Sequence, residues 1–414
     1  MRTDPWRCRC APGGVLPAGR PCPDRQCRGT ARARRHKARL SRTVHAARFA
    51  RLCRLCRLRI PSPRRHARRP RLVLAVEEAR VSGPRFPHPV LVADIGGTNC
   101  RLSLVPTPGA LHEPLARIST GAHPTPEAAL GSVLSTLTVK PRSAILAVAG
   151  PLDGRKAQLT NASWHFDGPV LGKALGFEQG LLVNDFEALA ASLAVLRDRD
   201  LFNLVHGQPE PEGPRLVLGP GTGFGAAALL RRGDTGMLVP TESGHIGIGP
   251  EDPTEVKLWP ALAEGLPRVT VEELLSGSGL IRFHRAVMPQ SDVAEPDVSA
   301  ADVSALALDG NPAALMAVVC FWRLLARVAG DLALGFKATG GVYLAGGIAP
   351  RILPLADKAT IHAVFAGKPP VEDLAARFAL NVITTDDAAE QGLAAIAATP
   401  SRFGLDDPAR LWFG

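Results

Sequence analysis

Short apolar runs alternate with glycine turns and amphipathic stretches from Pro89 onward, a pattern that predicts strands alternating with helices. The runs at 90–97 and 101–107 predict two strands joined by a tight Gly-Gly turn. Alternating strands and helices are typical of an α/β protein, and the glycine turns recur at strand ends, where ligands gather in open α/β folds. Further predictions are buried strands within 142–154, 215–233 and 340–348, a strand running into a helix at 179–196, and helices at 126–139, 253–287 and 311–339.

The chain length of 414 residues, 46% of them hydrophobic, predicts two or three domains with a substantial core. No stretch approaches the roughly 18 consecutive apolar residues that a membrane helix needs, and no apolar signal-peptide core follows the N-terminus. We therefore expect a cytoplasmic globular protein without a membrane partner.

The net positive charge of the chain comes entirely from residues 1–88. This segment holds 24 of the 49 Lys and Arg and 4 of the 38 Asp and Glu, a net charge of +20, whereas residues 89–414 carry −9. Its arginine-dense, proline-broken sequence lacks the apolar periodicity of a core and predicts disorder. A translation start downstream of it, or an Arg-rich and acid-poor targeting segment, are the open alternatives. Nucleic-acid binding is disfavoured, because non-specific attraction to phosphate follows from charge alone and no helix-turn-helix pattern is present.

Cysteine follows the same division, since only Cys100 and Cys320 lie after residue 88. A disulfide framework is therefore excluded for the main body of the chain. Cys53 and Cys56 have the spacing of a zinc-binding pair, but the neighbouring pairs have other spacings and the ligand pattern is not ordered. Incidental cysteines are the favoured interpretation.

The stretch LVADIGGTNCRLSLV, residues 91–105, places one carboxylate, Asp94, before Gly96 and Gly97 and then Thr98 and Asn99. Glycine lets backbone N–H groups approach an anion closely, because no Cβ intervenes, and the two polar residues add donors. A carboxylate beside such a nest would repel phosphate unless a divalent cation stood between them, so Asp94 implies Mg²⁺. The stretch predicts a site for a metal-bound polyphosphate, with an ordinary β-hairpin turn as the alternative.

A second glycine loop, GPGTGFG at 219–225, repeats this design with Thr222 between Gly221 and Gly223. Two such loops suit the two ends of one nucleotide phosphate chain. A dinucleotide-binding fold is disfavoured because the residues after the loop continue as a strand and do not open a helix. A Walker loop also fails: the nearest match, 168–175, has three residues and not four between its glycines, and Ala174 where Ser or Thr should bind magnesium.

Asn184 and Asp185 stand at the end of the apolar strand within 179–196. An acid at this position is exposed at the edge of a cleft and can accept a proton from a hydroxyl, as the base of a phosphoryl transfer must. Helix N-capping is the alternative role, and the local sequence by itself favours it.

Glu242 and His245 flank a flexible glycine in VPTESGHIGIG, and Glu272 precedes LLSGSGL. Carboxylate, imidazole and amide groups together suit a polyol, whose hydroxyls each donate and accept hydrogen bonds. Taken singly, His245 is better explained as a satisfied structural histidine, and Glu272 as a solvated helix residue or cap.

Residues from about Pro89 to Arg402 resemble the bacterial glucokinase family, in the branch without the cysteine-rich zinc motif, within the actin, sugar kinase and heat-shock ATPase superfamily. The joint order of the motifs is far more specific than any one of them. The resemblance implies an α/β, two-domain actin-like ATPase (ribonuclease H-like) sugar kinase fold with an interdomain cleft. The motifs that carry it are DIGGTNCRL, LTNASWHF, NDFEALAASL, GPGTGFG, ESGH, LLSGSGL and GGVYLAGGIAPR.

This resemblance implies ATP-dependent phosphorylation of glucose at its 6-hydroxyl, with Asp185 as the catalytic base and Mg²⁺ bound at Asp94 through water. Gly346 and Gly347 would let the adenosine lie close to the backbone. The implied sugar ligands are Asn184, Glu242, His245, Glu272 and Asn161. The implied phosphate loops are Asp94, Gly96, Gly97, Thr98 and Asn99 for the first and Gly221, Thr222 and Gly223 for the second.

The resemblance also implies a smaller α/β domain, 89–196 plus a returning helix near 386–403, beside a larger domain at 197–385. Their cleft would close on the sugar and exclude water. The implied partners are glucose, ATP and a second copy of the chain in a homodimer.

Other functions stay open at this point. Gly247 follows the GH motif where the family commonly has an acid, and Pro220 stiffens the second loop, so a related hexose is an alternative substrate. ADP or polyphosphate is an alternative donor. A repressor-related sugar kinase is disfavoured because no cysteine lies between Cys100 and Cys320. A sugar-sensing regulator and a catalytically silent sugar-binding module remain, and Asp185 argues against the second.

Overall fold

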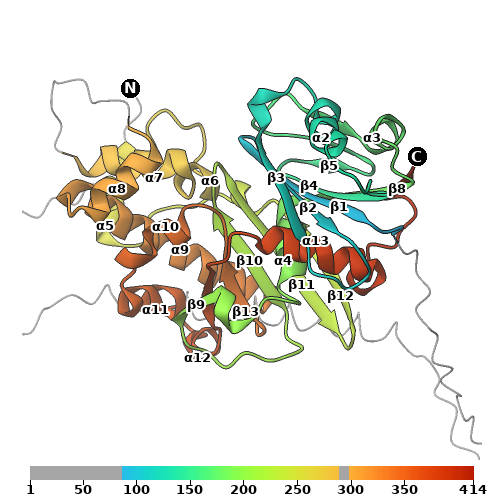
Figure 1. Ribbon diagram of the computed structural model, residues 1–414. Helices are drawn as coiled ribbons and strands as arrows, with labels where there is room; N and C mark the ends of the chain where they lie inside the picture. The colour runs from blue at the N-terminus through green and yellow to red at the C-terminus, as the bar shows by residue number, and fades with distance from the viewer. Residues whose placement is uncertain (1–85, 289–297) are drawn as a thin grey trace, which may run out of the picture. The chain divides into compact units, whose positions relative to one another are not determined.

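Two six-stranded mixed sheets form the framework of this computed structural model, which describes residues 86–288 and 298–414 (Figure 1). The predictions made for residues 1–85, including the Cys53 and Cys56 pair, lie outside the described residues. The first sheet has the order β15-β8-β4-β1-β2-β3: Leu411–Phe413, Gln179–Asn184, Ser143–Val148, Val90–Ile95, Asn99–Val105 and Glu113–Ser119. The second has the order β12-β11-β10-β13-β14-β9: Thr235–Thr241, Phe224–Arg232, Arg215–Pro220, Gly341–Leu344, Leu380–Ile383 and Leu201–Val205.

The two sheets repeat one topology. In the first, β1 is antiparallel to β2 and parallel to β4, β2 is antiparallel to β3, and β4 is parallel to β8. In the second, β10, β11, β12, β13 and β14 take the same places in the same order. An antiparallel strand, β15 or β9, is added beside the last parallel strand of each sheet. The β1–β2 turn and the β10–β11 turn, which are the two predicted phosphate loops, therefore occupy equivalent positions.

Strand β1 is apolar at every position except Asp94 near its end. Val90 and Val92 pack into one hydrophobic cluster, while Leu91, Ala93 and Ile95 pack into another on the opposite face of the sheet. Because successive side chains of a strand point to opposite faces, a strand that is covered on both sides needs apolar residues on both of them.

Helices α4, Asp185–Ser192, and α13, Ala388–Ala398, pack against each other between the two sheets (Figure 1). Their contact is close because Gly392 has no side chain: a Cβ there would lie 1.9 Å from the carbonyl oxygen of Ala188. Cluster residues from both sheets, including Val183 and Val217, surround this pair. Helix α13, near the end of the chain, thus packs on strands of the first sheet.

The outer face of the first sheet is covered by two helices and a small sheet. Helices α2, Pro126–Ser135, and α3, Gly168–Leu175, contribute Leu130 and Leu171 to the cluster on this face. The small sheet has the order β5-β6-β7: Leu152–Asp153, Lys156–Gln158 and His165–Asp167. The helix α2 ends four residues before the predicted boundary, because the β-branched Thr136, Thr138 and Val139 and then Pro141 disfavour its continuation.

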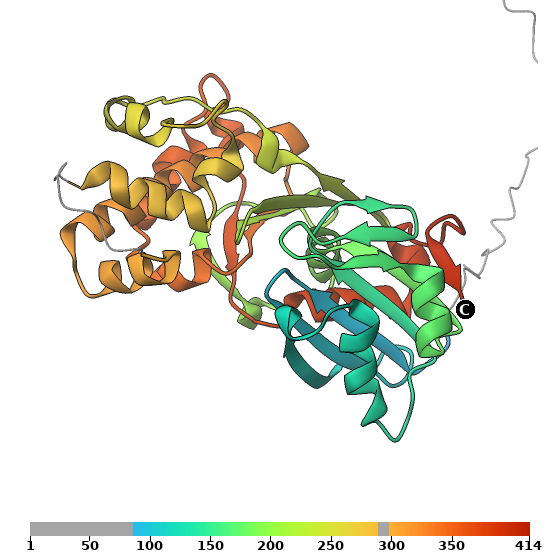
Figure 2. The same cartoon turned by 90° about the horizontal axis from the view of Figure 1, so that it is seen from above.

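Helices cover the second sheet on the side away from the first sheet, where the chain is yellow to red in Figure 2. The predicted helix at 253–287 is three helices, because a proline lies inside the first and Gly265 and Pro267 follow it. The helices that cover this side of the second sheet are α5 Pro253–Leu262, α6 Val271–Leu274, α7 Gly277–Val287, α8 Ala300–Leu308, α9 Pro312–Phe336, α10 Ala349–Ile352, α11 Lys358–Ala366 and α12 Glu372–Ala375. Short 3₁₀ helices are η1 Thr120–Ala122, η2 Asp198–Asp200, η3 Ser243–His245, η4 Leu353–Leu355 and η5 Pro400–Phe403.

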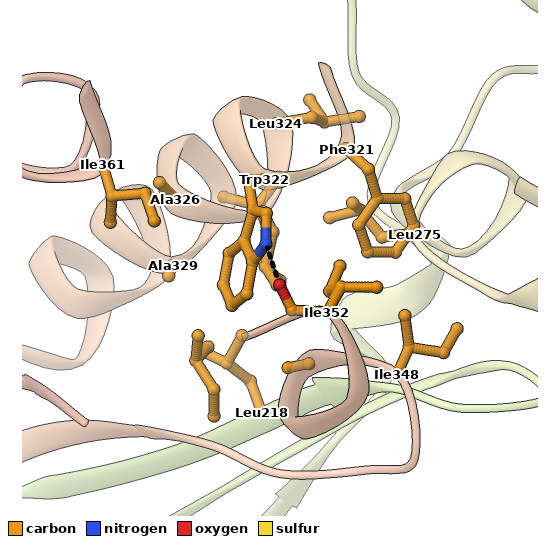
Figure 3. Packing of buried hydrophobic residues seen from close by; sticks show 14 of the residues in the cluster. Leu218, Leu275, Phe321, Trp322, Leu324, Ala326, Ala329, Ile348, Ile352 and Ile361 are labelled. Atoms are coloured by element: carbon orange, nitrogen blue, oxygen red, sulfur yellow. Dashed lines mark hydrogen bonds between the residues drawn. The ribbon is translucent and has the colours of Figure 1, made fainter. Parts of the chain in front are cut away.

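Helix α9 is the central helix of this second core. It is long and apolar enough to cross a membrane by length and composition, with a mean hydropathy of 1.7, but 72% of that window is buried inside the protein. Trp322 packs among Leu218, Ile352 and Ile361, and its indole N–H donates to the carbonyl of Ile352 at 3.2 Å (Figure 3). Burial identifies α9 as the core helix of a globular protein.

Candidate active site

Asp185 is the first residue of α4, directly after β8 ends at Asn184. The Asn184 side chain caps this helix: its Oδ1 accepts from the backbone N–H of Phe186 at 3.0 Å, and its Nδ2 donates to the carbonyl of Gly150 at 3.3 Å. The N-cap role that the sequence left open therefore belongs to Asn184. The Asn184 side chain also takes part in a capping box with Glu187 and hydrogen-bonds to Asp185.

The environment of Asp185 in the protein stabilises the protonated carboxyl group relative to the same group in water. Burial, with the nearby Asp94 carboxylate as the second cause, raises the pKa of Asp185 to about 7. Backbone and side-chain hydrogen bonds at the start of α4 oppose this rise. A carboxyl group with its pKa near the working pH is suited to accept a proton from a hydroxyl.

Asp94 and Asp185 occupy the same edge of the first sheet. Ile95, Val148 and Asn184 form one row across the parallel strands β1, β4 and β8. Since neighbouring strands lie about 4.8 Å apart, β1 and β8 are separated by about 10 Å at this edge. Burial raises the pKa of Asp94 as well, and the Arg101 guanidinium, 3.9 Å away, opposes the rise.

The first glycine loop is a β-hairpin turn, as the alternative interpretation held. Gly96 N–H donates to the carbonyl of Asn99 at 2.9 Å, and the Thr120 hydroxyl donates to the carbonyl of Gly96 at 2.8 Å. Within the described ranges, the N–H groups of Gly97 and Thr98 have no hydrogen-bond acceptor in the protein. Two donors thus remain for an anion, so the hairpin is compatible with phosphate binding.

Asn161 lies against this first loop. A Cβ added to Gly97 would stand 2.9 Å from the Cβ of Asn161 and 3.3 Å from its carbonyl oxygen. The glycine at this position is therefore required by a close approach, and the predicted sugar ligand Asn161 is placed beside the predicted phosphate loop.

The second glycine loop is also a hairpin turn, one residue shorter than the first. Gly221 N–H donates to the carbonyl of Gly223 at 2.8 Å, and the carbonyl of Gly221 accepts from Gly277 N–H at 3.0 Å. The N–H groups of Thr222 and Gly223 are without a protein acceptor in the part of the chain that the structure describes. Both loops therefore present two backbone donors at equivalent positions of the two sheets.

Glu272 joins the second loop to the predicted sugar ligands. Its Oε2 accepts a hydrogen bond from the backbone N–H of Phe224 at 2.8 Å, and lies 2.4 Å from where a Cβ of Gly223 would be. Its Cβ also packs on Gly244, at the centre of the ESGH motif. Glu272 is thus neither a cap nor a solvated helix residue.

Like Asn161, Glu242 and His245 are exposed members of the predicted sugar set. Their side chains are 83% and 64% exposed, and Glu242 Oε2 lies 3.7 Å from His245 Nε2. Gly244 lies between them in sequence and packs on Phe224: a Cβ added to Gly244 would stand 2.5 Å from the carbonyl oxygen of Phe224. The side chain of Phe186, next to Asp185, fills the space over Gly225 in the same way. These contacts bring the ESGH motif and the first turn of α4 to the second loop.

Gly346 and Gly347 follow β13 and lie beside the second loop. Gly346 has φ +84° and would place a Cβ 2.4 Å from the carbonyl oxygen of Pro220, whereas a Cβ on Gly347 would meet nothing within 4 Å. Gly346 is thus needed by the backbone, and Gly347 presents an open surface on which a flat ring can lie.

Known proteins resemble this chain in sequence and in fold. The family model described as Glucokinase matches residues 91–400. The chain is 41% identical over 329 residues to a glucokinase of Rhizobium meliloti and 40% identical over 329 residues to one of Sinorhizobium fredii; each match covers 79% of this chain and 97% of the relative. The chain belongs to the glucokinase family. A crystal structure of glucokinase from an Antarctic psychrotroph, 31% identical, superposes with a TM-score of 0.66 over 75% of this chain and 98% of that chain.

Membership of the glucokinase family confirms the resemblance predicted from the ordered motifs. The expected actin-like sugar kinase fold is also confirmed, and the repeated topology of the two sheets gives its physical basis.

Two side chains of this glucokinase-family site were missed by the sequence analysis. Arg101 lies beside Asp94 and donates to the carbonyl of Asp386 at 2.5 Å. Glu390 is 4% exposed, and burial, with Asp94 as a further cause, raises its pKa to about 7. Glu390 lies within α13 in an alanine-rich stretch, where no local motif distinguishes it. Only tertiary packing brings it to Asp94.

The donor set fits Mg²⁺ that arrives with a nucleotide. The described residues contain no group of three or more His, Cys, Asp or Glu that could hold a metal ion. Asp94 offers one carboxylate beside the first loop. Mg²⁺ is commonly held by one or two carboxylates together with substrate phosphates and waters, so one acid at this place is sufficient.

Proposed function

We propose that this member of the glucokinase family transfers the γ-phosphoryl group of ATP to the 6-hydroxyl of glucose, giving glucose 6-phosphate and ADP. Asp185 takes the proton of the 6-hydroxyl of glucose. The hydroxyl oxygen forms the new bond to the γ-phosphorus, and the bond from that phosphorus to the β–γ bridging oxygen breaks. The observation that carries this proposal is Asp185 itself, with a pKa of about 7 at the start of a helix that touches the second glycine loop. Phosphoryl transfer requires mainly positioning, charge stabilisation and one acceptor for the proton.

The two glycine loops would hold the phosphate chain from opposite sides. The free N–H groups of Gly97 and Thr98 face it from the first sheet and those of Thr222 and Gly223 from the second. The open surface of Gly347 would receive the adenosine. Asp94, through water, would hold Mg²⁺, which neutralises negative charge that develops on the phosphate oxygens.

Glucose would be held by side chains from both sheets. Asn184 lies at the end of β8 beside Asp185, and Glu242 and His245 are exposed. Glu272 uses one oxygen on the second loop and retains Oε1 for the sugar. Asn161 completes the proposed set from beside the first loop.

We extend this proposal to the organisation of the protein. The smaller domain consists of 89–196 plus 386–403 and the larger of 197–385, and closure of the cleft between them excludes water that would otherwise accept the phosphoryl group. The protein acts in the cytoplasm as a homodimer. The covering of the first sheet by α13 supports the discontinuous smaller domain.

The deciding experiment measures ADP release from Mg-ATP by the purified chain when glucose is added, with Asp185→Asn beside it. Glucose-dependent turnover that falls by roughly 10²–10⁴-fold in the variant supports the kinase and its base. Parallel assays with mannose, fructose and N-acetylglucosamine test the second candidate, a related hexose kinase, which Gly247 after the GH motif favours. Absence of turnover with every sugar, in a preparation that binds glucose, would contradict the enzymatic proposal.

A further inference from the structure

The helix that carries Asp185 is held at its start by a second carboxylate, Glu187. Glu187 is 2% exposed, and its Oε2 accepts a hydrogen bond from the backbone N–H of Asn184 at 2.9 Å. Together with the Asn184 side chain, this bond closes a capping box around the Asn184–Asp185 peptide. A carboxylate so deeply buried requires an ionic or hydrogen-bonded partner.

Arg410, close to the end of the chain, is that partner. Its Nη1 donates to Glu187 Oε1 at 3.0 Å and its Nη2 to Glu187 Oε2 at 2.9 Å, so the guanidinium holds both carboxylate oxygens. The same Nη2 also lies 3.4 Å from the carbonyl oxygen of Leu182 in β8. Such a two-pronged contact fixes the orientation of the carboxylate as well as its charge.

The backbone around Arg410 is itself fixed. Its N–H donates to the carbonyl of Asp407 at 3.0 Å, and β15, which begins at the next residue, pairs with β8. Trp412 in β15 is fully buried, and its ring occupies the space left by Gly168, Gly172 and Gly180. Arg410 lies beyond residue 400, where the match to the family model ends.

We infer that Arg410 is a positioning residue for the catalytic base: through Glu187 it fixes the start of α4 and thereby the carboxylate of Asp185. This inference rests on the proposed glucose phosphorylation. Loss of the guanidinium leaves the Glu187 carboxylate without its ionic partner, and the backbone N–H of Asn184, in the peptide just before Asp185, loses its fixed acceptor. A misplacement of the base by about 1 Å can cost up to about 10²-fold in rate.

The experiment compares Arg410→Gln, Arg410→Lys and Arg142→Gln with wild type. Arg142 and Glu178 supply the matched control, because they form the same two-pronged pair, at 2.6 and 2.8 Å, just before the other end of β8, and both are about half exposed. Turnover and the KM for glucose are measured well below the melting temperature of each variant, and circular dichroism verifies that each is folded.

We expect kcat to fall about tenfold or more in Arg410→Gln, with a smaller rise in the KM for glucose, because Glu242, His245 and Glu272 do not lie on α4. Arg410→Lys keeps the charge but loses one prong, so its kcat should be intermediate. Arg142→Gln should keep both constants at the wild-type values.

A purely structural role for Arg410 makes a different prediction. It would lower the melting temperature of the Arg410 variants but leave kcat and KM of the folded protein unchanged, and this result would overturn the inference. Arg410→Lys decides the question if Arg410→Gln does not fold. An inactive wild type refutes the proposed function, whereas an active wild type with equally active Arg410 variants refutes only the positioning role.

Discussion

The carboxylate of Glu272 accepts a hydrogen bond from the backbone N–H of Phe224 at 2.8 Å, so a proposed sugar ligand supports the second phosphate loop directly. The bond leaves Glu272 Oε1 for the sugar. One side chain therefore contacts both the proposed sugar site and the nucleotide loop. Sugar binding at Glu272 can affect the nucleotide loop through this contact.

Glu272→Ala should weaken the binding of both substrates. The variant removes a sugar contact and leaves the Phe224 N–H without its acceptor, a loss that costs about 1–3 kcal/mol, or about 5- to 150-fold in affinity. Steady-state kinetics with each substrate varied in turn should show a higher KM for glucose and for ATP. Glu273→Ala on the same helix is the matched control. An unchanged KM for ATP in Glu272→Ala would restrict Glu272 to sugar binding.

The raised pKa of Asp185 predicts the pH dependence of the reaction. A base must be ionised to accept a proton, so kcat/KM for glucose should level off above pH 8 and decrease about tenfold per pH unit well below pH 7. Asp185 and Glu390 both have a pKa of about 7, and Glu390→Gln distinguishes them. If Asp185 causes the decrease of kcat/KM at low pH, the Glu390→Gln variant should still show it. A flat profile down to pH 5 would contradict the assignment.

Glu390 should make stability depend on pH. Its pKa is raised from 4.5 to about 7 in the folded protein, so folding favours the protonated acid. The stability that comes from this preference is fully present below pH 4.5 and is lost as the pH rises to about 7. Thermal unfolding should therefore show Glu390→Gln melting above wild type at pH 8, with the difference disappearing by pH 4. A difference in melting temperature that stays constant between pH 4 and pH 8 would exclude Glu390 as the source of the pH dependence.

Gly346 and Gly347 should respond differently to alanine. Gly346→Ala forces a side chain into a left-handed backbone, with φ +84° and a Cβ 2.4 Å from the carbonyl oxygen of Pro220, and should lower the melting temperature. Gly347→Ala meets nothing in the protein and should melt like wild type. Its KM for ATP should nevertheless rise several-fold if the adenosine lies on this surface. A wild-type KM for ATP in a folded Gly347→Ala would place the nucleotide elsewhere.

Strand and helix boundaries near the glycine loops could be predicted because local chemistry determines them. The apolar strand that carries Asp94 at 90–95, the Gly-Gly turn and the strand that runs into a helix at Asp185 all appear in the structure. Strand β15 carried no comparable signal, because three residues are too short for a periodic pattern and their pairing with β8 is a long-range event. Helix α9 has no run of 18 consecutive apolar residues, but its length and mean hydropathy pass the test for a membrane span, and only its burial decides otherwise.

The sequence by itself determined the family, through the order of its motifs, and it singled out Asp185, Asp94 and the two glycine loops as chemically exceptional. Which N–H groups of each loop remain free and how Glu272 reaches Phe224 were decided by tertiary structure alone. So were the approach of Glu390 to Asp94 and the pairing of Arg410 with Glu187. These contacts join residues far apart in the chain, and the burial and charge that set their chemistry exist only when the two sheets and α13 have packed together.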